Sequence, residues 1–173
     1  GRFELGPSDS EIRRDAGDMP YGVAFTDFDR DGWVDLWVTQ YDGSGGPQRD
    51  RLYRNQGDSA FKEVAQDKGI VTEAWSQISD LNEAKAHTRS WSALACDLNN
   101  DGWPELLSSS YGRSPNHLWK ARGDGRYENE SVASGYAFDH RLDWSDNESA
   151  RCWCMHNPTS ADCAGVPEPE LIA

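Results

Sequence analysis

The stretch Asp27-Phe28-Asp29-Arg30-Asp31-Gly32-Trp33-Val34-Asp35-Leu36 decides the fold, because it returns 70 residues later as Asp97-Leu98-Asn99-Asn100-Asp101-Gly102-Trp103-Pro104-Glu105-Leu106. In both copies acidic or amide side chains stand at positions 1, 3, 5 and 9, with Gly at 6 and Trp at 7. Oxygens at alternate positions of a tight loop can converge on one point, and Gly permits the sharp turn. The sequence therefore predicts two metal-binding loops.

Ligands that are all oxygen, without His or Cys, suit a hard cation, and the number of oxygens favours Ca²⁺ over Mg²⁺. An EF-hand is excluded, because position 12 is Val38 or Ser108 where that motif needs a bidentate Glu. The carbonyls of Trp33 and Trp103 can complete the two shells. The predicted side-chain ligands are Asp27, Asp29, Asp31 and Asp35 for one Ca²⁺, and Asp97, Asn99, Asp101 and Glu105 for the other.

The repeat is longer than its loop. Residues 22–26 and 37–41 flank the first loop and are rich in β-branched and aromatic residues, which is typical of strands. Two further strands are expected over 51–55 and 61–64, and the second copy repeats them at 117–121 and 127–130. Each copy is thus a four-stranded antiparallel unit of the size of a propeller blade.

We predict an all-β fold: two four-stranded antiparallel propeller-type blades, a partial β-propeller, with a short inserted helix and a Cys-rich, irregular C-terminal segment. Helical spacing of Trp75, Ile78 and Leu81 places the helix within 72–86, with Thr72 as N-cap. Residues 2–5 look like the last strand of a preceding blade. The expected divisions are 1–19 (end strand and connector), 20–70 (first blade), 71–90 (helical connector), 91–138 (second blade) and 139–173 (Cys-rich loop and Pro-rich tail).

Composition limits the partners. The 173 residues carry a net charge of −13, which excludes nucleic acid and disfavours anionic membranes. No apolar run reaches the length of a membrane-spanning helix, so no direct membrane insertion is expected. His87, His117, His140 and His156 fit no catalytic triad or metal-binding helix pattern, and we expect no enzymatic activity.

The cysteines also bear on location. Calcium loops of modest affinity need the near-millimolar Ca²⁺ found outside the cytosol, where disulfides form. We expect an extracellular, cell-surface or periplasmic protein in which Cys152 or Cys154 pairs with Cys163, while Cys96 is a small buried residue. A zinc site formed by Cys152, Cys154, His156 and Cys163 is the alternative, although its spacing departs from the usual zinc patterns.

The two copies resemble the FG-GAP/VCBS repeats of integrin-α-type β-propellers, most closely the ASPIC/UnbV and cartilage acidic protein branch. The resemblance is carried by residues 22–36, by Leu52-Tyr53-Arg54-Asn55 with Gly57-Asp58, and by 61–70. It implies a secreted or cell-surface propeller with a Ca²⁺ between the first two strands of each blade, held by the residues named above. The helix and the Cys-rich tail have no counterpart in a plain repeat, and a closed propeller needs about 4–8 blades.

The expected function is that of a non-catalytic, calcium-binding interaction, adhesion or assembly module. Its partner would be other polypeptide, either the missing blades of a parent protein or neighbouring subunits. The alternative is part of a carbohydrate-binding or polysaccharide-degrading propeller protein, because eight Trp are available to stack on sugars. The Trp residues outside the repeat are the candidates for that contact: Trp75, Trp91, Trp144 and Trp153.

Overall fold

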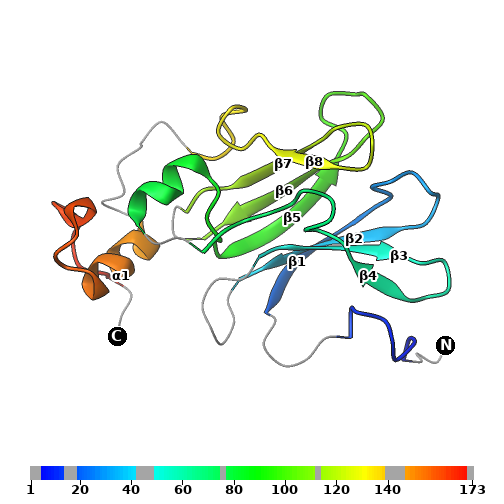
Figure 1. The fold of residues 1–173 in the computed structure, drawn as a ribbon, viewed down its shortest axis with the longest axis horizontal. Helices are drawn as coiled ribbons and strands as arrows, with labels where there is room; N and C mark the ends of the chain where they lie inside the picture. Colours follow the sequence, from blue (N-terminus) through cyan, green and yellow to red (C-terminus); the bar gives the residue numbers. More distant parts are fainter. Residues whose placement is uncertain are drawn as a thin grey trace.

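The structure, a computed structural model, describes residues 5–13, 19–41, 49–74, 77–111, 114–138 and 147–170. Two four-stranded antiparallel sheets, each with its strands in chain order, form its centre (Figure 1). The first contains β1 (Pro20–Thr26), β2 (Asp35–Gln40), β3 (Arg51–Asn55) and β4 (Phe61–Glu63). The second contains β5 (Ser90–Cys96), β6 (Glu105–Ser110), β7 (His117–Ala121) and β8 (Tyr127–Asn129). The predicted pair of four-stranded antiparallel units is therefore confirmed.

The pairing registers repeat with the sequence. Thr26 pairs with Asp35 at the end of the β1–β2 hairpin, and Cys96 pairs with Glu105 at the end of the β5–β6 hairpin. The two predicted metal loops are the connections closed by these pairs. Each sheet thus carries its loop at the same end of its first two strands.

The sheets pack against each other through different faces. Trp37 and Leu52 of the first sheet share a buried core with Leu106 and Trp119 of the second. Successive strand residues point to opposite faces, so Leu107, the repeat counterpart of Trp37, points away from this core. The second sheet is therefore stacked on the first in the same sense, as successive repeats would be.

The first strands of the two sheets come very close together at Gly22. A Cβ on Gly22 would lie 2.5 Å from the backbone nitrogen of Ala93 and 2.8 Å from Oγ1 of Thr39. Only glycine fits this contact, because the nearest atom belongs to backbone that cannot rotate away.

The inserted helix is shorter than expected. The structure has a 3₁₀ helix, η1 (Ile78–Glu83), with Gln77 rather than Thr72 as its N-cap. Thr72 instead places its hydroxyl 2.5 Å from Nδ1 of His87, and Glu73 pairs with Ala86. This pairing keeps the ends of the predicted 72–86 helix extended, and Trp75 lies outside the described residues.

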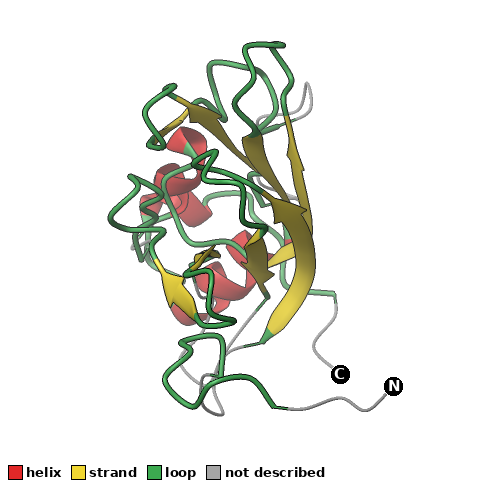
Figure 2. Ribbon diagram, turned by 90° about the vertical axis from the view of Figure 1, so that its right-hand side faces the viewer, coloured by secondary structure: helices red, strands yellow, loops and turns green. Residues whose placement is uncertain are grey.

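The C-terminal segment was expected to be irregular, but the part that the structure describes, residues 147–170, is largely helical. It contains α1 (Glu148–His156) and a 3₁₀ helix, η2 (Ala161–Cys163). The side chain of Asn147 accepts a hydrogen bond from the Ala150 N–H and so caps α1. In Figure 1 α1 lies beside η1, and both lie behind the sheets in Figure 2, which is seen from the right-hand side of Figure 1.

The helices share a small core of their own. Ile78 and Leu81 of η1 pack with Ala150 and Cys154 of α1. The chain then turns back, so that Glu170 lies 2.9 Å from Arg151 of α1. Within the described ranges, no helix is long and apolar enough to cross a membrane.

The predicted N-terminal strand falls mostly outside the described residues, which begin at Leu5. Leu5 is exposed and is not in a strand. Ser10 and Glu11, further along, bond to the edge of β4: Glu11 N–H donates to the carbonyl of Phe61 (2.8 Å), and the Ser10 hydroxyl accepts from Phe61 N–H (2.9 Å). The edge of the first sheet is thereby covered by the chain itself.

Candidate metal centre

The first loop brings three of its predicted ligands together. Asp27, Asp29 and Asp35 each offer a carboxylate oxygen, and these oxygens all lie within 4.8 Å of one another. Asp35 is fully buried and is held from two sides: Oδ1 accepts the Asn55 N–H (2.8 Å) and Oδ2 accepts the Phe28 N–H (3.1 Å). The sheet therefore fixes this carboxylate from its own backbone.

The backbone of the loop curls around these oxygens. Asp27 Oδ2 accepts the Gly32 N–H (3.0 Å), and Asp31 Oδ1 accepts the Trp33 N–H (2.9 Å). Gly32 has a φ of 86°, a region that favours glycine. The Trp33 side chain packs against the turn at Gly57, where an added Cβ would lie 3.1 Å from the indole ring.

Two oxygens of this cluster lack a protein partner. Oδ1 of Asp27 and Oδ1 of Asp29 are buried from solvent and accept no hydrogen bond. Buried anionic oxygens without partners are costly, and a cation is the usual compensation. Ca²⁺ takes oxygens at about 2.3–2.6 Å, so ligands on opposite sides of the ion lie about 5 Å apart. The spacing of the three carboxylates fits this ion.

The electrostatics of the loop point the same way. Burial, reinforced by the charges of Asp29 and Asp31, raises the pKa of Asp35 to about 6. The Trp33 N–H and Arg54 hold the pKa of Asp31 below its usual value. Negative charge is thus concentrated around Asp35, where a cation would remove the penalty for ionisation.

Arg54 belongs to the candidate site and was not predicted from the sequence. Its Nε lies 2.6 Å from Asp29 Oδ2 and its Nη2 lies 2.8 Å from Asp31 Oδ2. Asp31 is consequently held by Arg54 and by its own loop, and it is not one of the three converging carboxylates. The sequence held no local signal for this role, because the contact depends on how β3 lies beside the first loop.

The second loop has the same backbone pattern but satisfies its own oxygens. Asp97 accepts the N–H groups of Asp101 (3.0 Å) and Gly102 (2.8 Å), and Glu105 accepts that of Leu98 (2.8 Å). The amide nitrogen of Asn99 lies 2.9 Å from Asp101 Oδ2 and 3.5 Å from Glu105 Oε1. The predicted ligands are therefore adjacent, with an internal donor between them.

No second converging group of three His, Cys, Asp or Glu side chains is found in the parts of the chain that the structure describes. The second loop differs from the first because Asn99 replaces a carboxylate and supplies an N–H donor. A cation there requires the Asn99 amide to turn so that its oxygen faces the carboxylates.

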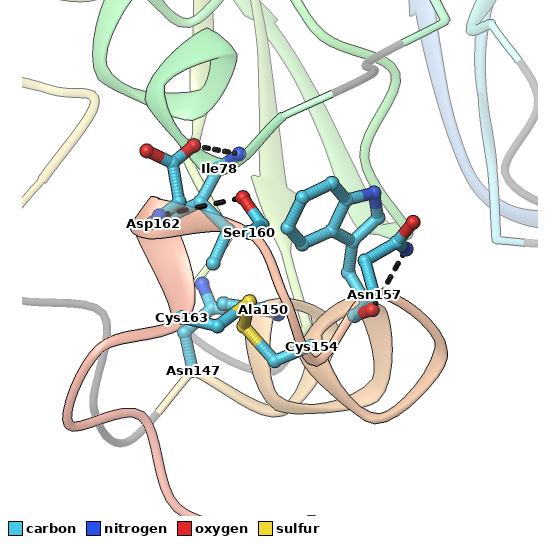
Figure 3. Close-up of a disulfide and its surroundings, with 9 residues drawn as sticks. Ile78, Asn147, Ala150, Cys154, Asn157, Ser160, Asp162 and Cys163 are labelled. Carbon is cyan, nitrogen blue, oxygen red and sulfur yellow. Dashed lines mark hydrogen bonds between the residues drawn. A yellow bond between two sulfur atoms is a disulfide. The ribbon is translucent and has the colours of Figure 1, made fainter.

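A disulfide links Cys154 of α1 to Cys163 of η2 (Figure 3). This is one of the two pairings expected from the sequence, and Cys152 and Cys96 are free thiols. The zinc alternative is wrong in this structure, because two of its sulfurs are bonded to each other. Near the disulfide, the Asp162 carboxylate accepts the Ile78 N–H (3.0 Å), which ties η2 to η1.

Four aromatic rings form a cluster at the end of the sheets opposite to the metal loops. Tyr21 and Trp91 begin the first strands, and Tyr41 and Tyr111 follow the second strands. Trp91 has its ring centroid 5.6 Å from that of Tyr21, 5.7 Å from that of Tyr41 and 5.0 Å from that of Tyr111. Tyr21 is 51% and Trp91 48% exposed. We call these four residues the aromatic cluster.

The sequence contained a signal for this cluster, since Trp91 and Tyr111 stand 70 residues after Tyr21 and Tyr41. Trp91 is thus part of the repeat, contrary to the sequence-based interpretation. Of the other candidate Trp residues, Trp153 packs against the helical core, and Trp75 and Trp144 lie outside the described residues.

No protein-family model matches the chain, and no curated protein matches it.

Proposed function

We propose that this chain is a calcium-binding module without catalysis of its own, in which Ca²⁺ stabilises the connection between the first two strands of each sheet. The observation that carries the proposal is that Asp27 and Asp29, which converge with the buried carboxylate of Asp35, each have a buried oxygen without a partner. The similarity of the two loops to FG-GAP/VCBS repeats supports Ca²⁺ as the ion.

The metal would act on structure. It would neutralise carboxylates that otherwise repel one another, and it would hold the loop in the curled conformation that its backbone bonds already favour. The arrangement of the first loop suits this role because the carboxylates come from a strand end and a short loop on a rigid sheet.

Calorimetric titration with Ca²⁺ tests the proposal. The wild-type chain should release or absorb heat on binding, and Ca²⁺ should raise its melting temperature. Asp29→Asn should weaken binding at the first loop by at least about tenfold, since a charged ligand is lost. Asp67→Asn, which changes an exposed carboxylate outside the loops, is the matched control. Equal affinities in wild type and Asp29→Asn would contradict the assignment.

We further propose that the module works in an extracellular, cell-surface or periplasmic setting and joins other polypeptide. The Cys154–Cys163 disulfide supports an oxidising compartment. Val23 and Phe25 on β1 and Leu94 on β5 point away from the shared core and are more than half exposed. In the repeat, these exposed positions are equivalent to positions of the other sheet that pack in the core between the two sheets. This equivalence supports further blades or a neighbouring subunit as the partner that covers them.

Sedimentation in millimolar Ca²⁺ tests this assembly role. We expect the wild-type chain to associate and Phe25→Glu to abolish the association. Val71→Glu, at an exposed connector position, is the control and should keep it. A compact monomer that melts cooperatively would contradict it.

The aromatic cluster favours carbohydrate as a second candidate ligand. Tyr21 and Trp91 are half exposed on the first strands of the two sheets, and exposed aromatic faces stack on the apolar faces of sugars. Binding to a panel of neutral polysaccharides should be lost on Trp91→Ala and largely retained on Trp91→Phe. Binding that survives Trp91→Ala and Tyr21→Ala together would exclude the cluster as the site.

A further inference from the structure

The two metal loops are closed by different donors. In the first loop the carbonyl of Val34 accepts a hydrogen bond from Nδ2 of Asn55, which belongs to the same sheet and also bonds to Asp35 (3.1 Å and 2.8 Å). The equivalent carbonyl in the second loop is that of Pro104. Ala121 stands in place of Asn55 there, and it offers no side-chain donor.

Tyr127 takes over this task in the second loop. Its hydroxyl donates to the Pro104 carbonyl (3.1 Å). The counterpart of Tyr127 in the first sheet is Phe61, so the hydroxyl occurs only in the sheet that lacks the asparagine. The donor that closes the second loop is therefore a buried tyrosine at the edge of that sheet.

Tyr127 also contacts the first loop. Its ring centroid lies 6.5 Å from that of Phe28, and the Phe28 N–H donates to Asp35, one of the three converging carboxylates. The Tyr127 N–H donates to the carbonyl of Lys68 (2.8 Å), in the segment that leaves the first sheet. Tyr127 thus joins the first loop, the connector and the second loop.

Arg30 provides a second link between the loops. It lies between Asp29 and Asp31 with a φ of 61°, and its guanidinium lies over the ring of Trp103 in the second loop, 5.3 Å from the ring centroid. A Cβ on Gly102 would be 3.5 Å from Nη1 of Arg30. The side chain therefore rests directly on the turn of the second loop.

We propose that Tyr127 and Arg30 couple the two loops, so that Ca²⁺ in the first loop strengthens Ca²⁺ binding in the second. This inference rests on the calcium-binding function proposed above. Ca²⁺ held by Asp29 and Asp35 would fix Arg30 and Phe28, which adjoin these ligands. Fixing them holds the Trp103 ring and the Tyr127 hydroxyl in the positions that keep the second loop closed. The second ion then binds to a loop that is already ordered, which lowers the entropic cost of binding.

Direct charge interactions act in the opposite direction. A first Ca²⁺ makes its loop less negative and repels a second ion nearby. This repulsion is screened at high salt, because the Debye length at about 0.5 M ionic strength is only about 4 Å. The coupling carried by contacts is therefore best measured in high salt, where the charge interaction between the loops is suppressed.

The test is a calorimetric cycle with Ca²⁺ at high salt. Asp29→Asn isolates the second loop, and Asp101→Asn isolates the first. We expect the overall two-site constant of wild type to exceed the product of the two isolated constants by at least about fivefold. Tyr127→Phe, which removes only the hydroxyl, should bring this ratio to about one. The Arg30→Gln variant should lower it as well.

Tyr136→Phe is the matched control, because it removes a hydroxyl 3.0 Å from Ser109 Oγ on the same sheet, away from the loops. It should keep the ratio of wild type. A ratio of one in wild type with two measurable sites would overturn the coupling and leave the calcium function intact. A ratio lost equally in Tyr136→Phe would overturn the assignment to Tyr127. Absence of any Ca²⁺ binding would overturn both proposals.

Discussion

The indole Nε1 of Trp37 donates a hydrogen bond to the backbone carbonyl of Leu107, 2.9 Å away. Leu107 occupies in the second sheet the position that Trp37 occupies in the first. A side chain of one copy of the repeat therefore bonds to the backbone of the other copy at the equivalent position. Both groups are buried, so the bond fixes how far one sheet can slide along the other.

Trp37→Phe should lower the free energy of unfolding by about 2–3 kcal/mol, because it leaves the Leu107 carbonyl without its partner and removes buried ring volume. Chemical denaturation measured at saturating Ca²⁺ checks this. Trp91→Phe, at the half-exposed aromatic cluster, is the control and should cost less than about 1 kcal/mol. Equal losses in the two variants would mean that the bond between the sheets is not a major contributor.

The strands could be predicted closely because two independent signals agreed. β-branched and aromatic runs marked the strands, and the 70-residue repeat marked them twice, so β3 was predicted over 51–55 and lies at Arg51–Asn55. The curled shape of the first predicted metal loop was also foreseeable, since it follows from Asp, Gly and their spacing. These are local features, which depend on residues close together in the chain.

Features that depend on distant residues could not be read in this way. The ion pairs from Arg54 to Asp29 and Asp31 require the register of β2 and β3. The choice of Cys154 over Cys152 depends on helix α1: residues two apart on a helix point to different sides, and Cys154 is the one that faces Ile78 and η2. The sequence pattern did not reveal the helical periodicity of α1, which has only nine residues and lies in a Cys-rich stretch.

We expect Arg54 to limit the Ca²⁺ affinity of the first loop. Because its guanidinium already neutralises part of Asp29 and Asp31, Arg54→Gln should increase the Ca²⁺ affinity of this loop several-fold and lower the melting temperature measured in chelator. The Ca²⁺-induced rise in melting temperature should therefore become larger than in wild type.

Lys120→Gln is the control for Arg54→Gln, since Lys120 has the equivalent place in β7 and its side chain is exposed. Its effects on affinity and melting should be small. If Arg54→Gln instead weakened Ca²⁺ binding, Arg54 would be needed to position the ligand carboxylates rather than competing with the ion for their charge.

Asp50 should make stability fall as the pH rises from about 4 to about 7. Burial raises the pKa of this carboxyl from 3.8 to about 7, while its oxygens accept from the Gln40 N–H (2.9 Å) and the Ser90 hydroxyl (3.1 Å). Between these pH values the folded chain keeps a proton that the unfolded chain has lost. The stabilisation is thus complete below about pH 4 and is lost as the pH approaches 7, with a total on the order of 4 kcal/mol.

Asp50→Asn should remove this pH dependence, because the amide stays neutral throughout and keeps an acceptor for Gln40. The measurement is the difference in unfolding free energy between wild type and variant at pH 5 and pH 8, in chelator. The variant should gain relative to wild type at pH 8. A difference that does not change with pH would show that Asp50 is ionised in the folded chain across this range.

The disulfide should stabilise the helical C-terminal unit and leave the sheets unaffected. Cys154 and Cys163 are nine residues apart, and closing a loop of this length contributes about 2–3 kcal/mol in the chain-entropy view. Replacing both by Ala should therefore increase amide hydrogen exchange in α1 and η2 and expose the segment to proteolysis. Cys152→Ala, which removes a free thiol from the same helix, should change neither.

Exchange in β2 and β6 should stay at wild-type rates, since their core is the separate one around Trp37 and Leu106. Faster exchange in those strands would show that the C-terminal unit and the two sheets unfold together.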